Sequence, residues 1–154
     1  MNNIKKLSVV VPVYNCIDTI NELFTRLEKS LKKVVNNFEI IFVDDSKDYK
    51  TWETLESISK KSNSVLCIKL SRNFGQHAAI TAGLDNSTGD WLVIMDCDLQ
   101  DRPEEIINLV QAIDDKTDIV FASRKKRHDN FLKKITSKFF YFLIEILTEI
   151  KMDH

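Results

Sequence analysis

Short apolar runs alternate with segments of helical periodicity along this chain, and that alternation constrains the fold more than any other feature. Apolar runs at 7–13, 38–43, 65–70, 91–95 and 119–122 predict strands. A helical pattern follows each run, and the last predicted helix covers 131–150. This order favours an α/β fold with a mainly parallel sheet and helices on both faces. The 154 residues suit one domain, so we expect a single unit over 1–154.

The charge balance argues against a general nucleic-acid binder. The chain has 22 basic and 23 acidic residues, which gives a formal net charge of -1. Hydrophobic residues make up 44% of the chain, so we expect it to be globular. No run approaches the roughly 20 apolar residues that a membrane-spanning helix needs. We therefore expect a cytoplasmic location.

The cysteines and histidines predict neither a disulfide framework nor a zinc site. Cys16, Cys67 and Cys97 are odd in number and have no CxxC spacing. They are expected to be buried free thiols in a reducing cytosol. The three histidines lack the spacing of zinc ligands.

Ligands of parallel α/β sheets bind beyond the carboxyl ends of the strands, so the residues that follow each predicted strand are the candidates for chemistry. These residues are mostly polar or charged. They are Pro12, Tyr14 and Asn15; Asp44, Asp45 and Ser46; Ser71, Arg72 and Asn73; Asp96, Asp98, Gln100 and Asp101; and Ser123, Arg124 and Arg127.

The segment 96–101 has the sharpest local pattern. Asp96, Asp98 and Gln100 alternate, so on extended backbone they would project to one side and offer hard oxygen ligands to Mg²⁺ or Mn²⁺. A metal held there would neutralise a diphosphate. Alternatively, this acidic turn caps the helix predicted from Pro103.

The pair Asp44-Asp45 after the second predicted strand also has two interpretations. One carboxylate would accept hydrogen bonds from a base or a ribose. The alternative is the acidic pair of a phospho-receiver domain, which is disfavoured because Arg124 follows the fifth predicted strand, where a receiver has Lys.

Three motifs carry a family resemblance that covers nearly the whole chain. The segments are SVVVPVYN at 8–15, EIIFVDDS at 39–46 and LSRNFGQHAAITAGLDNSTGDWLVIMDCDLQDRPE at 70–104. Together they resemble family-2 glycosyltransferases, in particular the subgroup that acts on polyprenyl phosphates. This resemblance implies a Rossmann-like, nucleotide-sugar-binding half of a GT-A fold. It also implies transfer of a sugar from a UDP- or GDP-sugar to a polyprenyl phosphate, with inversion and with Mg²⁺ or Mn²⁺.

The resemblance assigns roles residue by residue. Nucleotide binding falls to Pro12, Tyr14, Asn15, Asp44, Asp45, Arg72 and Asp96. The metal ligands are Asp96, Asp98 and Gln100, and the residues acting in catalysis are Asp96, Asp98, Arg124 and Arg127. A lipid phosphate is already ionised, so no catalytic base is nominated.

The chain departs from the family pattern at three places. Ser46 stands where Gly usually follows the acidic pair, and Cys16 stands where an acidic residue commonly follows the first motif. The sequence ends at His154, whereas relatives continue into an acceptor-binding portion. A non-catalytic nucleotide-sugar-binding module is therefore the alternative to an active transferase.

The predicted helix at 131–150 is aromatic and is flanked by lysines. One interpretation places it at the membrane surface, which would make the protein peripheral on the cytoplasmic face. It would otherwise pack in the core, or expose an apolar face and favour homo-oligomers.

Overall fold

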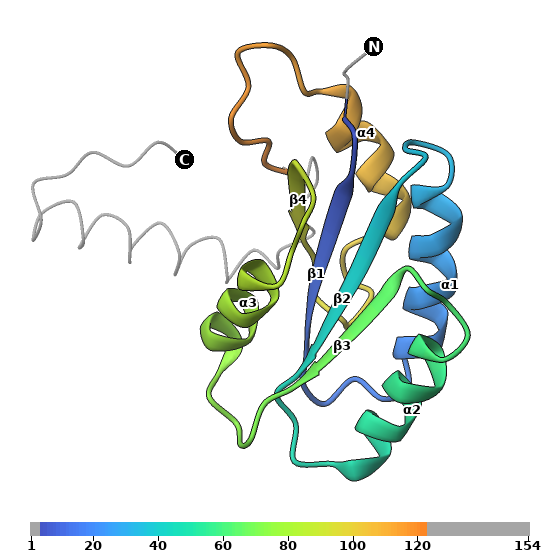
Figure 1. The fold of residues 1–154 in the computed structure, drawn as a ribbon, viewed down its shortest axis with the longest axis vertical. Coiled ribbons are helices and arrows are strands. Elements are labelled where there is room, and N and C mark those ends of the chain that lie inside the picture. Colours follow the sequence, from blue (N-terminus) through green and yellow to red (C-terminus); the bar gives the residue numbers. More distant parts are fainter. Residues whose placement is uncertain (1–3, 123–154) are drawn as a thin grey trace, which may run out of the picture. The chain divides into compact units, whose positions relative to one another are not determined.

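The computed structural model describes residues 4–122, and their strands form one parallel sheet (Figure 1). The sheet has four strands in the order β3-β2-β1-β4. The strands are β1 (Leu7–Val13), β2 (Phe38–Asp44), β3 (Val65–Lys69) and β4 (Trp91–Ile94). The predicted α/β class and parallel pairing are confirmed. Residues up to Phe121 form one compact unit, and the extent of the domain over 1–154 stays a prediction.

The central strand β1 is buried along its whole length. It pairs with β2 from Leu7 opposite Phe38 to Val13 opposite Asp44, and with β4 on its other edge. Its valine-rich sequence suits this position because both faces of the strand are covered.

Helices cover both faces of the sheet, as predicted (Figure 1). One face packs against α1 (Ile20–Leu31), α2 (Tyr49–Ser59), the short 3₁₀ helix η1 (Pro103–Glu105) and α4 (Ile106–Gln111). The apolar stripe of α1, which includes Leu23 and Leu27, is fully buried there. The other face packs against α3 (Gln76–Asp85).

The helix α3 lies very close to β1 because Gly83 has no side chain. A Cβ added to Gly83 would lie 2.3 Å from Cγ1 of Val10. The buried contact between these residues brings the first turn of α3 over the carboxyl end of β1.

Two local predictions were wrong. The run at 119–122 forms no strand; Ile119 and Phe121 are exposed, and a strand requires a ladder partner, which no described residue supplies. The spacing of Thr19 and Glu22 in the sequence predicts a capping box at the start of α1, but Thr19 makes no side-chain cap hydrogen bond. Its Oγ1 instead lies within hydrogen-bond distance of the carbonyl oxygens of Cys16 and Cys97, at 2.9 and 2.6 Å.

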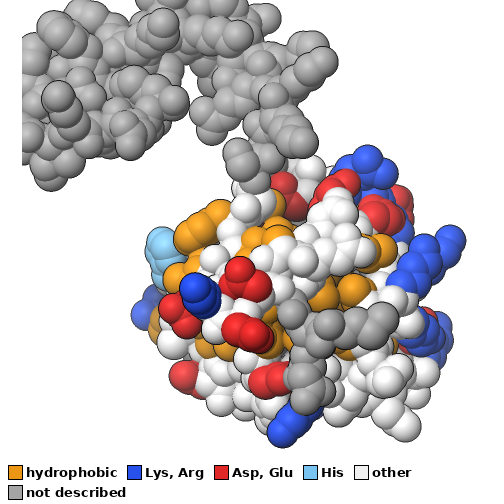
Figure 2. Space-filling model, turned by 90° about the horizontal axis from the view of Figure 1, so that it is seen from above, with side chains coloured by type: hydrophobic (Ala, Val, Ile, Leu, Met, Phe, Trp, Pro, Cys, Tyr) orange, Lys and Arg blue, Asp and Glu red, His pale blue; other side chains and the backbone are white. Residues whose placement is uncertain are grey.

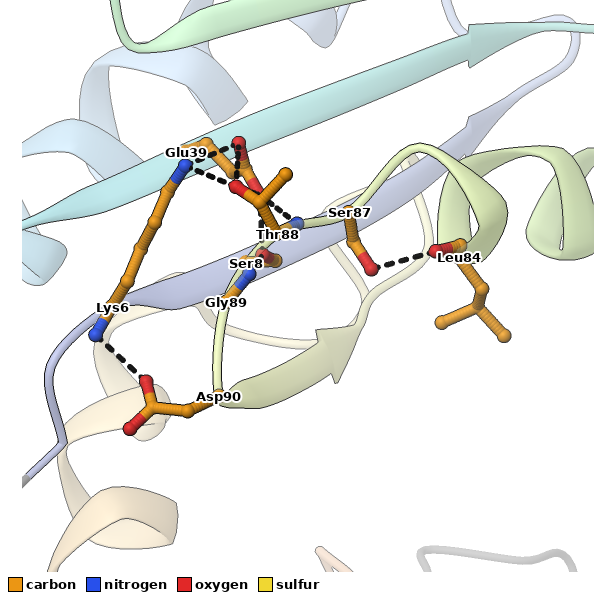
Figure 3. A network of polar contacts seen from close by, with 8 residues as sticks. All are labelled: Lys6, Ser8, Glu39, Leu84, Ser87, Thr88, Gly89 and Asp90. Atoms are coloured by element: carbon orange, nitrogen blue, oxygen red, sulfur yellow. Dashed lines mark hydrogen bonds and ion pairs between the residues drawn. The ribbon is translucent and has the colours of Figure 1, made fainter.

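A polar network holds the beginning of β4 against β1 and β2 (Figure 3). Glu39 accepts hydrogen bonds from Lys6, Ser8 and Thr88, and Ser8 accepts one from the backbone of Gly89. Partial burial would raise the pKa of Glu39, but these donors outweigh it and hold the pKa at about 2.

This network lies at the amino ends of the strands, opposite the predicted site. The described surface seen from that end carries acidic, basic and apolar side chains close together (Figure 2). Neither sign of charge dominates this view.

Candidate functional site

A pocket of about 450 Å³ opens at the carboxyl ends of β1, β2 and β4. That volume falls within the range of small-molecule sites. It is lined by Pro12, Val13, Tyr14, Asp45, Asn73, Gly75, Gln76, Ala79, Asp96, Cys97 and Asp98. These residues come from four strand exits and the first turns of α3, so parallel pairing brings together segments that are distant in sequence.

Asp45 shapes the pocket wall by fixing the turn that precedes α3. Its two carboxylate oxygens accept hydrogen bonds from the backbone N–H groups of Phe74 and Gly75, at 2.7 and 2.8 Å. The side-chain amide of Asn73 donates to its carbonyl oxygen at 3.0 Å. Asp45 was predicted to bind nucleotide, and the structure places its carboxylate on this turn.

Gly75 occupies a backbone conformation that side chains rarely adopt, with φ of 94°. No atom lies within 4 Å of the position where its Cβ would be. A ligand in the pocket can therefore approach this backbone closely.

Asp44 is completely buried at the end of β2. Its Oδ1 accepts hydrogen bonds from the N–H and the hydroxyl of Ser46, at 3.0 and 2.6 Å. Its Oδ2 is also buried and finds no partner in the described part of the chain. A buried carboxylate oxygen without a donor is costly, and Asp44 is not among the residues that line the pocket.

The acidic segment after β4 is a turn rather than extended backbone. Leu99 has φ of 61°, and the N–H of Gln100 donates to Oδ1 of Asp98 at 2.9 Å. The expectation that Asp96, Asp98 and Gln100 alternate on extended backbone was therefore wrong. Asp96 and Asp98 line the pocket, and Gln100 does not.

Gln76 at the start of α3 contacts the acidic segment. Its Nε2 donates to Oδ1 of Asp96 at 2.8 Å. Carboxylates at a pocket wall supply the hard oxygen donors that Mg²⁺ and Mn²⁺ prefer, so this donor set fits such an ion. No cluster of three His, Cys, Asp or Glu side chains arranged for a metal occurs within residues 4–122.

Of the other residues that were predicted to bind nucleotide, some line the pocket and some do not. Pro12 and Tyr14 line the pocket, and Tyr14 is 55% exposed. Asn15 has φ of 54° and is not among the lining residues. The guanidinium of Arg72 stacks on the ring of Phe74 at 4.1 Å, also outside the lining.

Arg124, Arg127 and the segment 131–150 lie outside the described residues. Their assigned roles stay predictions. Within the described part of the chain, no helix has the length and apolar character needed to cross a membrane.

Cys16 and Cys97 form a disulfide beside the pocket, with 6.1 Å between their Cα atoms. The expectation of three free thiols was wrong for this pair. The two residues follow neighbouring strands, β1 and β4, so the parallel pairing brings them within bonding range across 81 residues of sequence. Cys67 is a free thiol, as predicted, but it is only partly buried.

The sequence argument did not single out several lining residues. Gln76, Gly75 and Cys97 belong to this group. Each lies in the motif at 70–104, but only the folded chain shows that Gln76 reaches Asp96.

The chain matches the family model "Glycosyl transferase family 2" over residues 8–153. It is 38% identical over 146 residues to the undecaprenyl-phosphate 4-deoxy-4-formamido-L-arabinose transferase of Klebsiella pneumoniae (strain 342). The alignment covers 94% of this chain and 45% of that protein, so the chain spans about half the length of this curated relative.

Two solved structures have a similar fold. The mannosyltransferase PcManGT from Pyrobaculum calidifontis, in complex with GDP-Man and Mn²⁺, has a TM-score of 0.58 and 20% identity, covering 70% of this chain and 32% of that chain. S. aureus TarS in complex with UDP-GlcNAc has a TM-score of 0.51 and 32% identity, covering 60% of this chain and 26% of that chain. The fold is that of GT-A glycosyltransferases, and the chain belongs to glycosyl transferase family 2.

Proposed function

We propose that this chain supplies the donor-binding half of a glycosyltransferase that moves a sugar from a UDP- or GDP-sugar to a polyprenyl phosphate with inversion. The observation that carries the proposal is the pocket at the carboxyl edge of the sheet, which brings Asp96 and Asp98 together with the exits of β1 and β2. Family membership supports the reaction class.

The nucleoside part of the donor is assigned to the side of the pocket near β1 and β2. The unpartnered Oδ2 of Asp44 would accept a hydrogen bond from the base or the ribose. Tyr14 offers an exposed ring, and Pro12 forms part of the wall. Asn15 and Arg72 are assigned to the same donor, and Asp45 acts by holding the turn at Gly75.

The diphosphate is assigned to the side of the pocket near β4. Asp96 and Asp98, with Gln100, would hold Mg²⁺ or Mn²⁺, and the solved mannosyltransferase with this fold is in complex with GDP-Man and Mn²⁺. When bound, the ion would neutralise the charge that develops on the leaving diphosphate.

The proposed acceptor, a polyprenyl phosphate, is inferred from a curated relative. The curated relative from Klebsiella pneumoniae is named for transfer to undecaprenyl phosphate, which is a lipid phosphate. Such a phosphate is ionised at neutral pH, so the chain would act by positioning donor and acceptor rather than by removing a proton. Arg124 and Arg127 are assigned to phosphate binding, and 131–150 to the cytoplasmic membrane surface.

A non-catalytic nucleotide-sugar-binding module is the second candidate function. The observation that favours it is that all described lining residues of the pocket lie between Pro12 and Asp98. Within the described chain, the residues assigned to the donor and the metal therefore lie in that stretch, apart from Gln100.

The experiment is a calorimetric titration of the 154-residue chain with UDP, GDP and their sugars, first with Mn²⁺ and then with a chelator. We expect one nucleotide to bind only with the metal. Binding of none of them would overturn the proposal. Transfer of labelled sugar to a polyprenyl phosphate, measured by extraction of labelled lipid, then separates the transferase from the binding module.

A further inference from the structure

The disulfide between Cys16 and Cys97 joins the loop after β1 to the loop after β4, and both loops contribute residues to the lining of the pocket. Cys16 follows the loop that carries Tyr14, and Cys97 lies between Asp96 and Asp98. Both cysteines are 7% exposed. A bond at this place links the proposed nucleoside side of the site to the proposed metal side.

Both linked loops adopt backbone conformations that need support. Asn15, one residue before Cys16, and Leu99, two residues after Cys97, have positive φ values of 54° and 61°. Non-glycine residues rarely adopt this region, and it persists where the surroundings fix it. The disulfide is a covalent restraint on both loops.

A hydrogen bond of Thr19 also joins these loops. Oγ1 of Thr19 lies 2.6 Å from the carbonyl oxygen of Cys97 and 2.9 Å from that of Cys16. A hydroxyl has a single proton and donates to one of them at a time. Reduction of the disulfide therefore leaves this hydrogen bond as the tie between the loops, so the pocket would loosen without being lost.

We infer that Cys16 and Cys97 form a reversible thiol–disulfide site, and that its oxidation tightens binding of the nucleotide donor. This inference rests on the proposed function. Cys97 lines the pocket, so a small disulfide such as glutathione disulfide would approach it from that side once the reduced loops loosen. The Cys97 thiol displaces one glutathione thiol and forms a mixed disulfide. Cys16 then displaces the second, so that two protein thiols become one disulfide and glutathione disulfide becomes two glutathione thiols.

Cys67 provides a matched control within the same chain. It is a free thiol on β3, and its Sγ lies 3.4 Å from the carbonyl oxygen of Leu55. Burial raises the pKa of this thiol to about 11, which makes it a poor nucleophile at neutral pH. Cys67→Ala should leave the redox response of the other two cysteines unchanged.

The test compares donor binding by the oxidised and reduced forms of the 154-residue chain. The chain is equilibrated with glutathione disulfide or with a dithiol reductant, and alkylation of the denatured chain followed by mass spectrometry counts its free thiols. We expect one alkylated cysteine in the oxidised form and three in the reduced form. The oxidised form should bind UDP or GDP with Mn²⁺ about tenfold more tightly, because its loops are already ordered.

A second measurement separates control of binding from simple stabilisation. Coupling is reciprocal, so a saturating nucleotide with Mn²⁺ should shift the thiol–disulfide equilibrium toward the disulfide by the same factor. Cys16→Ser should bind like the reduced form and show no redox response. A merely structural bond would raise the melting temperature and leave the nucleotide affinity unchanged.

The remaining outcomes overturn the inference in distinguishable ways. Three alkylated cysteines under oxidising conditions would show that the bond does not form. Equal affinity, or tighter binding by the reduced form, would overturn the inference and leave the proposed donor site standing. No nucleotide binding in either form would overturn both.

Discussion

The side-chain amide of Gln76 donates a hydrogen bond to Oδ1 of Asp96 across 2.8 Å, and it joins the first turn of α3 to the end of β4. The two residues are 20 positions apart in sequence. A donor on one oxygen of a carboxylate fixes its orientation and thereby directs the second oxygen. Gln76 is therefore placed to orient the carboxylate that is proposed to bind the metal.

Replacing Gln76 tests that relationship. We expect Gln76→Ala to weaken Mn²⁺-dependent nucleotide binding by about 10-fold, as loss of an orienting hydrogen bond to a metal ligand does elsewhere. Gln76→Glu should weaken it further, because two carboxylates would then repel one another. Calorimetric titration measures both affinities. The control is His77→Ala at the adjacent exposed position, and an equal effect there would contradict the assignment.

Removing the Asp98 carboxylate tests the proposed metal site. Asp98→Ala should abolish metal-dependent nucleotide binding, because the ion loses an oxygen ligand. The side chain is exposed, so the fold and the thermal midpoint should change little. Titration in Mn²⁺ and circular dichroism check the two expectations. The matched control is Asp85→Ala at the end of α3, and unchanged binding by Asp98→Ala would mean that Asp98 is not a ligand.

The lowered pKa of Glu39 predicts that the free energy of unfolding falls in acid. Its pKa in the folded chain, about 2, lies below the usual value of 4.5. The ionised carboxylate therefore stabilises the fold above pH 4.5, and this contribution is lost as the pH falls from about 4.5 to about 2.

Denaturant unfolding between pH 2 and pH 7 measures this contribution. Glu39→Gln should be less stable than the native chain above about pH 4.5, and the difference should shrink as the pH approaches 2. Glu53→Gln is the control, since Glu53 is exposed on α2. A constant difference at every pH would show that Glu39 acts through packing alone.

The close contact of α3 with β1 predicts that Gly83 tolerates no side chain. An added methyl would lie 2.3 Å from Cγ1 of Val10, whose χ1 is restricted by β-branching. Overpacking costs more than the gain in helix propensity, so Gly83→Ala should lower the free energy of unfolding by about 1–2 kcal/mol. Chemical denaturation measures this value. Thr81→Ala on the exposed side of α3 should change it by less than about 0.5 kcal/mol.

The sequence was sufficient to predict four of the five expected strands and the edge of the sheet at which the pocket opens. The unbroken apolar run of β1 indicates a strand buried on both faces, and parallel pairing then follows from the helices between strands. Asp44, Asp96 and Asp98 lie at the expected strand ends for that reason.

The contacts between those strand ends could not be predicted. Cys16 and Cys97 meet because β1 and β4 are neighbouring strands. Their separation of 81 residues in the sequence does not indicate that these two strands pair. Local turns could not be predicted from the sequence pattern either. The backbone of Leu99 is left-handed, whereas the alternation of Asp96, Asp98 and Gln100 suggests an extended conformation. The apolar run at 119–122 shows that hydrophobicity alone does not make a strand.

The position of the pocket in the sequence also suggests how segments of different family members can be exchanged. Its described lining begins at Pro12 and ends at Asp98, and the four paired strands are complete by Ile94. We therefore expect the choice of donor to depend on the continuous stretch 12–100, which includes the proposed ligand Gln100. A chimera that joined this stretch to the later residues of another family member should inherit the nucleotide preference of this chain and the acceptor of the other.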